Sequence, residues 1–197
     1  MCLLALTQMK PFSKIEAISL IVIFSILITI SVPNFIVSLR RARDQVRRDD
    51  MGVLVHALTE YSADYGAFPT SSDDGLIMDC LKPGETPVKD SKDMRIINLI
   101  PCQWGKDAFT DLINGRIYMS ILPREPDYEK GAKYLYFSDG NRYQTYGAME
   151  GMDEAEIDPK IVAMGLVCGD KICNVGRSYN VPTDISIEEY NKTLLAK

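Results

Sequence analysis

The sequence predicts an α+β protein in which one long N-terminal helix packs on a small antiparallel β-sheet. Three features of the 197-residue chain support this fold class. An uncharged apolar run occupies residues 17–39, an amphipathic helical pattern continues to residue 65, and segments rich in β-branched and aromatic residues follow after residue 115. The length suits one domain with an extension better than two full domains.

The apolar run AISLIVIFSILITISVPNFIVSL covers residues 17–39 and carries no charge. As a helix it would extend roughly 34 Å, enough to cross a hydrocarbon core of about 30 Å. It is apolar on all sides, which is untypical of a core helix in a soluble protein. It is also longer than the apolar part of a signal peptide, and Arg40 and Arg41 follow it instead of small residues. We therefore expect a single retained membrane helix.

Charge is distributed unevenly along the chain. Residues 1–50 carry a net charge of +3, and the remaining residues carry −8. An acidic body argues against nucleic acid as a partner, because phosphate binding needs an excess of Lys and Arg on one face. Five arginines follow the apolar run within ten residues, and a positive-inside count would place the C-terminal domain in the cytoplasm. That count is unreliable for long translocated domains, and the cysteines indicate the opposite side.

The predicted helix continues beyond the membrane segment as an amphipathic helix, residues 40–66. Its apolar stripe has 3-4-3-4 spacing and consists of Met51, Leu54, Leu58, Tyr61 and Tyr65. Gly66 suits the left-handed position that ends a helix, and Pro69 prevents continuation. We expect one helix from about Ser13 to Tyr65.

The remainder, residues 67–197, is expected to form the globular part of the chain. Residues 70–115 are rich in Pro, Gly, Asp and Ser and predict a loop with one or two helical turns. Strands are expected within residues 115–121, 133–137 and 142–149, with a hairpin turn at 138–141. A further β-prone run covers residues 161–164.

The cysteines after the helix form an even set: Cys80, Cys102, Cys168 and Cys173. Four cysteines allow three pairings. Four residues around a Gly-Asp turn separate Cys168 from Cys173, so a tight hairpin can bring these two sulfurs together, which leaves Cys80 with Cys102. Disulfides indicate an oxidising compartment. Four unpaired thiols and a zinc site are the alternatives, and zinc is disfavoured because no Cys-x-x-Cys spacing occurs.

Signals for catalysis or cofactor binding are weak, and we expect no enzyme. The single histidine, His56, falls on the polar side of the predicted helix, and no phosphate loop, nucleophile elbow or paired His motif occurs. The acidic run 153–158 has carboxylates that suit calcium, but it lacks the alternating ligands and central Gly of a calcium loop. We interpret it as a solvated acidic stretch, with no cofactor.

The segment FSKIEAISLIVIFSILITISVPNF, residues 12–35, resembles the N-terminal segment of type IV pilins and of type II secretion pseudopilins, including the major pseudopilin. Their signature is a short basic leader, then Phe-Thr/Ser-Leu-Ile-Glu, an apolar run and a proline near its end. The string YSADYGAFP, residues 61–69, is similar to one that is common after the long helix in these families. The resemblance covers about 60 residues closely.

On that pattern, residues 1–11 form a leader, residues 12–39 the membrane and assembly helix, and the rest a pilin-like α+β domain. The resemblance implies that a prepilin peptidase cuts between Pro11 and Phe12, which removes Cys2, and that the Phe12 amine is then methylated. Glu16 would direct assembly, and Pro33 would kink or loosen the helix. Pro11 stands where the family has Gly, and Lys14 stands where it has Leu.

The resemblance further implies a structural subunit of a type IV pilus-like or type II secretion pseudopilus filament. Its partners would be copies of itself or related pilins, prepilin peptidase and the membrane. The chain would span a bacterial inner membrane once, with the C-terminal domain outside the cytoplasm, and would be periplasmic or extracellular in the filament. Some related pseudopilins bind calcium in C-terminal loops. The alternative is a membrane-tethered extracytoplasmic enzyme or binding domain whose anchor is only pilin-like.

Overall fold

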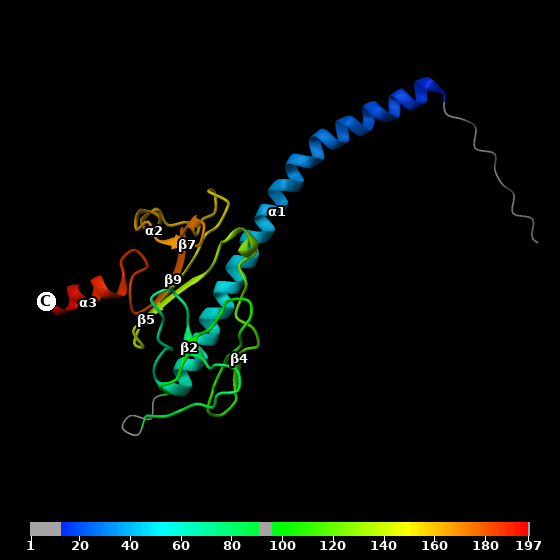
Figure 1. The fold of residues 1–197 in the computed structure, drawn as a ribbon. Helices are drawn as coiled ribbons and strands as arrows, with labels where there is room; N and C mark the ends of the chain where they lie inside the picture. The colour runs from blue at the N-terminus through cyan, green and yellow to red at the C-terminus, as the bar shows by residue number, and fades with distance from the viewer. Residues whose placement is uncertain (1–12, 91–95, 197) are drawn as a thin grey trace, which may run out of the picture. The chain divides into compact units, whose positions relative to one another are not determined.

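The computed structural model describes residues 13–90 and 96–196. The chain divides into two compact units, of which the first ends at Arg41 and the second begins at Ala42. Helix α1, Lys14–Tyr65, contributes to both units and is the longest element (Figure 1). The remaining helices and strands all belong to the second unit.

In the first unit, α1 is a helix whose side chains are exposed from Lys14 to Leu39. It passes through Pro33 without interruption. By length and composition it is the one helix among the described residues that could cross a membrane.

In the second unit, α1 buries one face against the rest of the domain. The buried positions recur at helical spacing and include charged as well as apolar side chains: Asp44, Arg47, Met51, Leu54, Ala57 and Leu58. The helix ends where Gly66 adopts a φ of 70° and donates its N–H to the carbonyl of Ser62, 2.8 Å away. The predicted helix and its glycine stop are therefore confirmed.

A three-stranded antiparallel sheet packs on this part of α1, with strand order β5-β6-β9. The strands are β5, Leu135–Ser138, β6, Tyr143–Gly147, and β9, Val175–Tyr179. Central strand β6 is buried along its whole length, and its side chains alternate between two clusters. Tyr143 packs in the cluster that contains Leu54 and Leu58 of α1, whereas Tyr146 packs on the other side of the sheet with Cys168 and Cys173.

Three two-stranded pairs complete the β structure: β1 (Met78–Cys80) with β2 (Ile100–Pro101), β3 (Phe109–Thr110) with β4 (Ile117–Met119), and β7 (Val167–Cys168) with β8 (Lys171–Ile172). The short helices are η1, Tyr128–Lys130, α2, Pro159–Ala163, and α3, Ile187–Leu195. The predicted α+β class, with a long N-terminal helix and small antiparallel sheets, is confirmed.

Two local predictions were wrong. The described residues between 70 and 115 contain strands β1, β2 and β3 and no helical turn. The run 161–164 belongs to helix α2 and its end instead of a strand, because Asp158 caps the helix by accepting the N–H of Lys160 at 2.9 Å and Pro159 occupies its first position. A four-residue apolar run does not distinguish helix from strand by itself.

Candidate functional site

The head of α1 is closed by a reciprocal pair of hydrogen bonds between Ser13 and Glu16. The N–H of Ser13 donates to Oε2 of Glu16 at 2.8 Å, and the N–H of Glu16 donates to the Ser13 hydroxyl at 3.2 Å. This arrangement is a capping box, which satisfies N–H groups that a helix start leaves without partners. The sequence Ser13-Lys14-Ile15-Glu16 carries its signature, which our sequence analysis did not use. Glu16 therefore has a local structural role in addition to the predicted assembly role.

Several polar side chains of the apolar segment of α1 are satisfied within the helix, which suits a lipid environment. Hydroxyl groups donate to carbonyls one turn earlier: Ser25 to Ile21 at 2.8 Å, Thr29 to Ser25 at 2.7 Å, and Ser38 to Asn34 at 2.9 Å. A spanning helix must satisfy its polar groups internally, because hydrocarbon offers no partners. The Thr29 hydroxyl, which is one candidate partner for the carbonyl that Pro33 frees, instead bonds to Ser25.

The predicted cleavage and methylation site falls on Pro11 and Phe12, which lie outside the described residues. Of the other positions implied by the resemblance, Glu16 lies at the exposed start of α1 and Pro33 lies within its continuous apolar part. The cysteines lie in the second unit.

Arg47 forms the centre of a buried ionic cluster where α1 begins to pack against the domain. Its guanidinium contacts four carboxylates: Asp44 at 2.7 Å, Glu125 at 2.5 Å, Asp127 at 3.0 Å and Glu150 at 2.8 Å. Its side chain has no exposed surface. A buried guanidinium is stable only when its donors are satisfied and its charge is balanced, and here both conditions are met by three separate segments of the chain.

Further cations balance the acidic members of this cluster. Arg43 makes two hydrogen bonds to Glu150, at 2.7 and 2.6 Å, and these hold the pKa of Glu150 below its ordinary value. Burial acts to raise the pKa of Asp127, but the ammonium groups of Lys171 and Lys130 overcome that effect and hold it below its ordinary value. The cluster thus joins α1, the segment before η1, the segment after β6 and the β7–β8 pair by paired charges.

The acidic run 153–158 is partly ion-paired to α1. Arg48 lies 3.1 Å from Glu154 and 2.6 Å from Glu156. Among the described residues, no group of three or more His, Cys, Asp and Glu side chains could hold a metal ion. His56 is exposed on α1, as the sequence predicts, with Glu60 4.0 Å away.

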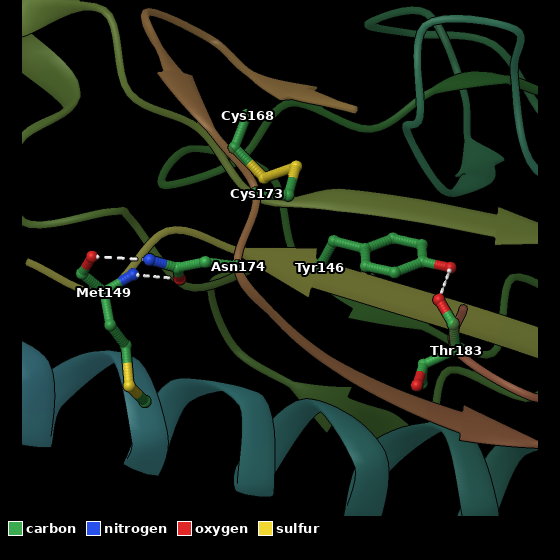
Figure 2. The surroundings of a disulfide bond; sticks show 6 residues. All are labelled: Tyr146, Met149, Cys168, Cys173, Asn174 and Thr183. Atoms are coloured by element: carbon green, nitrogen blue, oxygen red, sulfur yellow. Dashed lines mark hydrogen bonds between the residues drawn. A yellow bond between two sulfur atoms is a disulfide. The ribbon is translucent and has the colours of Figure 1, made fainter. Parts of the chain in front are cut away.

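The cysteines form two disulfides, Cys80–Cys102 and Cys168–Cys173, which is the pairing that the hairpin spacing favoured. Figure 2 shows the second of these beside Tyr146 and Asn174. Asn174 follows the disulfide directly, and its side-chain amide bonds both the N–H and the carbonyl of Met149, at 2.8 and 2.9 Å. The Met149 side chain points to α1 (Figure 2), where it packs with Met51.

The two hydrogen bonds between Asn174 and Met149, here called the Asn174 clamp, connect the disulfide to the ionic cluster. Met149 is followed by Glu150 and Gly151, whose N–H groups donate to the two carboxylate oxygens of Asp44, both at 2.9 Å. The same disulfide hairpin carries Lys171, whose ammonium lies 2.6 Å from Asp127. The Cys168–Cys173 hairpin therefore holds two of the segments that surround Arg47.

Another buried carboxyl group, outside the ionic cluster, lies nearer the end of α1. Asp79 of β1 is almost fully buried, and its Oδ2 has no hydrogen-bond partner within the described part of the chain. Burial, together with the charge of Asp111, raises the pKa of Asp79 to about 8. Asp111 is well satisfied by comparison, since it accepts the N–H groups of Ile113 and Asn114 at 2.8 and 2.9 Å.

The sequence of this chain matches no protein-family model, no curated protein and no solved structure. The roles of Ser13 and Arg47 were not predicted from the sequence. The first had a signal, the capping box, whereas the second had none, since Arg47 finds its distant partners only in the folded domain.

Proposed function

We propose that this chain is a subunit of a helical filament of the type IV pilus or type II secretion pseudopilus kind, held in the membrane by α1 before it assembles. The observation that carries the proposal is an exposed apolar helix with one acid, Glu16, near its start. Such a surface needs either lipid or other apolar helices to cover it. A bundle of identical helices would provide the second environment.

Glu16 would set the positions of neighbouring helices in such a bundle. In a low-dielectric bundle its carboxylate needs a cation at the same depth. The α-amine of Phe12 on a neighbouring subunit would become such a cation after leader cleavage. Lys14 lies two positions away, where a turn of about 100° per residue directs it to another side of the helix.

The ion pairs made by the arginines after the apolar run are consistent with this proposal. Arg43, Arg47 and Arg48 are paired with carboxylates of the folded domain, so a role in the fold accounts for these cations without a cytoplasmic location. Two disulfides favour an oxidising compartment for the same domain. We therefore propose that the C-terminal domain lies outside the cytoplasm.

Three substitutions distinguish a role of Glu16 in filament assembly from its role in capping α1. Glu16→Gln keeps the oxygen that accepts the Ser13 N–H but removes the charge, Ser13→Ala removes the cap hydroxyl but keeps the charge, and Glu16→Ala removes both the charge and the accepting oxygen. We expect Glu16→Gln and Glu16→Ala to abolish filaments and Ser13→Ala to assemble. Lys14→Leu should assemble at least as well as the natural chain.

Filament yield is measured beside the abundance of each variant in the membrane fraction, which should be equal for all four. Assembly of Glu16→Gln together with failure of Ser13→Ala would assign Glu16 to capping alone. Normal filaments from both Glu16 variants would leave the chain as a membrane-tethered binding domain or enzyme with a pilin-like anchor.

A further inference from the structure

The end of the second unit that adjoins the membrane segment carries exposed apolar and aromatic side chains. Met152 is 78% exposed and Tyr128 is 46% exposed. Both lie in segments that contact the first turns of α1 within this unit. Gly151, next to Met152, donates to Asp44, and Asp127, next to Tyr128, contacts Arg47.

Chain length places this end of the domain close to lipid. Asp44 lies five residues after Leu39, the last residue of the apolar run, and Arg47 eight residues after it. A chain extends by at most about 3.6 Å per residue, so these positions cannot lie farther than roughly 18 and 29 Å from the end of the run. The headgroup layer on each side of a bilayer is about 5–7 Å thick, so side chains at this end are within reach of it.

The segment that carries Met152 is held in place. Asn174 fixes Met149, Asp44 fixes the N–H groups of Glu150 and Gly151, and Arg48 pairs with Glu154 on the other side. Met152 is thus an exposed apolar side chain on a loop that is tied down on both sides of it. A tied loop loses little conformational entropy on contact with a surface.

The chemistry around Tyr128 matches the same environment. The guanidinium of Arg124 lies over the Tyr128 ring, 4.7 Å from its centroid, and also pairs with Glu129. Lys130, the last residue of η1, is mostly exposed at its side chain, and its ammonium also pairs with Asp127 at 2.9 Å. Tyrosines are enriched at the membrane–water interface, and long basic side chains extend from apolar surroundings to headgroups.

We propose that Met152 and Tyr128 mark a membrane-contact face, on which the domain rests against the headgroup layer of the bilayer that α1 spans. The occupant of this face is lipid, with Met152 and the Tyr128 ring at the depth of the headgroups and Lys130 beside their phosphates. This inference depends on α1 as a membrane anchor and not on filament assembly, so either can fail without the other.

Depth-dependent quenching tests the proposal on the full chain. The chain is reconstituted in vesicles of phosphatidylethanolamine and phosphatidylglycerol, with or without lipids that carry a nitroxide at the headgroup. Trp104, the natural tryptophan, is nearly buried and supplies a constant background. The reporters are Tyr128→Trp and Ile117→Trp. Ile117 is 63% exposed and precedes Tyr118, which contacts Asp64, so it lies roughly 30 Å farther along α1 than Asp44.

We expect the nitroxide lipids to remove most of the emission added by Tyr128→Trp and little of that added by Ile117→Trp. Met152→Asp, added to the Tyr128→Trp chain, should restore at least half of the lost emission, because a carboxylate at position 152 opposes contact with anionic headgroups. Ile117→Asp in the same background should restore none.

Two results would overturn the proposal. Equal quenching of both reporters would show that this end of the domain has no preferred contact with lipid. Strong quenching of Tyr128→Trp that Met152→Asp leaves unchanged would show proximity imposed by the short connection to α1, without docking. Circular dichroism of each variant checks that the domain is folded.

Discussion

Asp44 and Arg47 are one helical turn apart on α1, and their side chains form an ion pair of 2.7 Å with almost no exposed surface on either. Asp44 also accepts two backbone N–H groups from the segment after β6, and Arg47 contacts Glu150 of that same segment and Glu125 of the segment before η1. One turn of helix therefore fixes the position of two distant parts of the domain. Such a cluster is costly to break, because each remaining charge would be buried without a partner.

The first prediction concerns Arg47. Arg47→Met keeps much of the aliphatic volume but leaves Asp44 and Glu125 buried without their cation. We expect the free energy of unfolding to fall by about 3–5 kcal/mol. Denaturant titration of the oxidised chain in detergent, followed by circular dichroism, measures it.

Arg116→Met is the matched control. Arg116 also bridges two acids, Glu60 at 3.2 Å and Asp64 at 2.7 Å, but its side chain is about half exposed. Exposed pairs contribute less than about 1 kcal/mol, so this variant should unfold close to the natural chain. Equal losses for the two variants would mean that the cluster adds nothing beyond ordinary surface pairs.

The ends of α1 could be predicted from the sequence, whereas the burial of Arg47 could not. The bounds of α1 follow from local signals: Ser13 and Glu16 cap its start, and Gly66 ends it. Arg47 carries no such signal, because an arginine in a basic stretch normally predicts exposure. Its partners Glu125 and Glu150 are 78 and 103 residues away, and only the folded domain brings them to the helix.

Other elements were missed for reasons that differ. Ser186 caps helix α3 by accepting the N–H of Glu189 at 3.2 Å, so a Ser-x-x-Glu signature was present in the sequence and went unused. Strand β9 contains Gly176 and Arg177 and has no clear alternation of apolar residues. Its place in the sheet comes from pairing with β6, which local sequence does not reveal.

The second prediction concerns pH. The raised pKa of Asp79, about 8, means that the folded chain holds a proton that the unfolded chain releases near pH 4. Its contribution to stability is complete below about pH 4 and is lost as pH rises to about 8, by up to 1.4 kcal/mol per pH unit. Glu150 and Asp127 have lowered pKa values, so they stabilise the folded chain above about pH 4. Their contribution is lost as the pH falls further.

Asp79→Asn should remove this loss. Between pH 5 and 8 we expect the unfolding free energy of the variant to depend less on pH than that of the natural chain, and to exceed it at pH 8. Asp49→Asn, at an exposed position on α1, is the control and should follow the natural chain. Parallel pH profiles for Asp79→Asn and the natural chain would contradict the prediction.

The third prediction separates the two disulfides. Cys80–Cys102 closes a loop of 22 residues, and Cys168–Cys173 a loop of 5. By loop entropy alone, their removal by paired Ala substitutions should cost about 3 and 2 kcal/mol. The second pair also supports the Asn174 clamp on Met149 and the contact of Lys171 with Asp127. We therefore expect its loss to cost at least as much as the loss of the first pair, and a smaller cost would contradict the structural role assigned to the hairpin.

The last prediction uses Cys2 as a marker of processing. The other four cysteines are bonded in pairs, so Cys2 is the one thiol that a chain with both disulfides formed can offer. If a prepilin peptidase cuts before Phe12, chains unfolded without reductant should carry no free thiol, whereas uncut chains carry one. We expect membranes with active peptidase to yield chains without a thiol and membranes without peptidase to yield chains with one. Mass spectrometry should then find a methylated Phe12 at the mature N-terminus, and Pro11→Gly should be cut at least as completely. One thiol per chain from both membranes, together with an intact leader by mass, would rule out processing and leave Glu16 without the neighbouring amine that the assembly proposal requires.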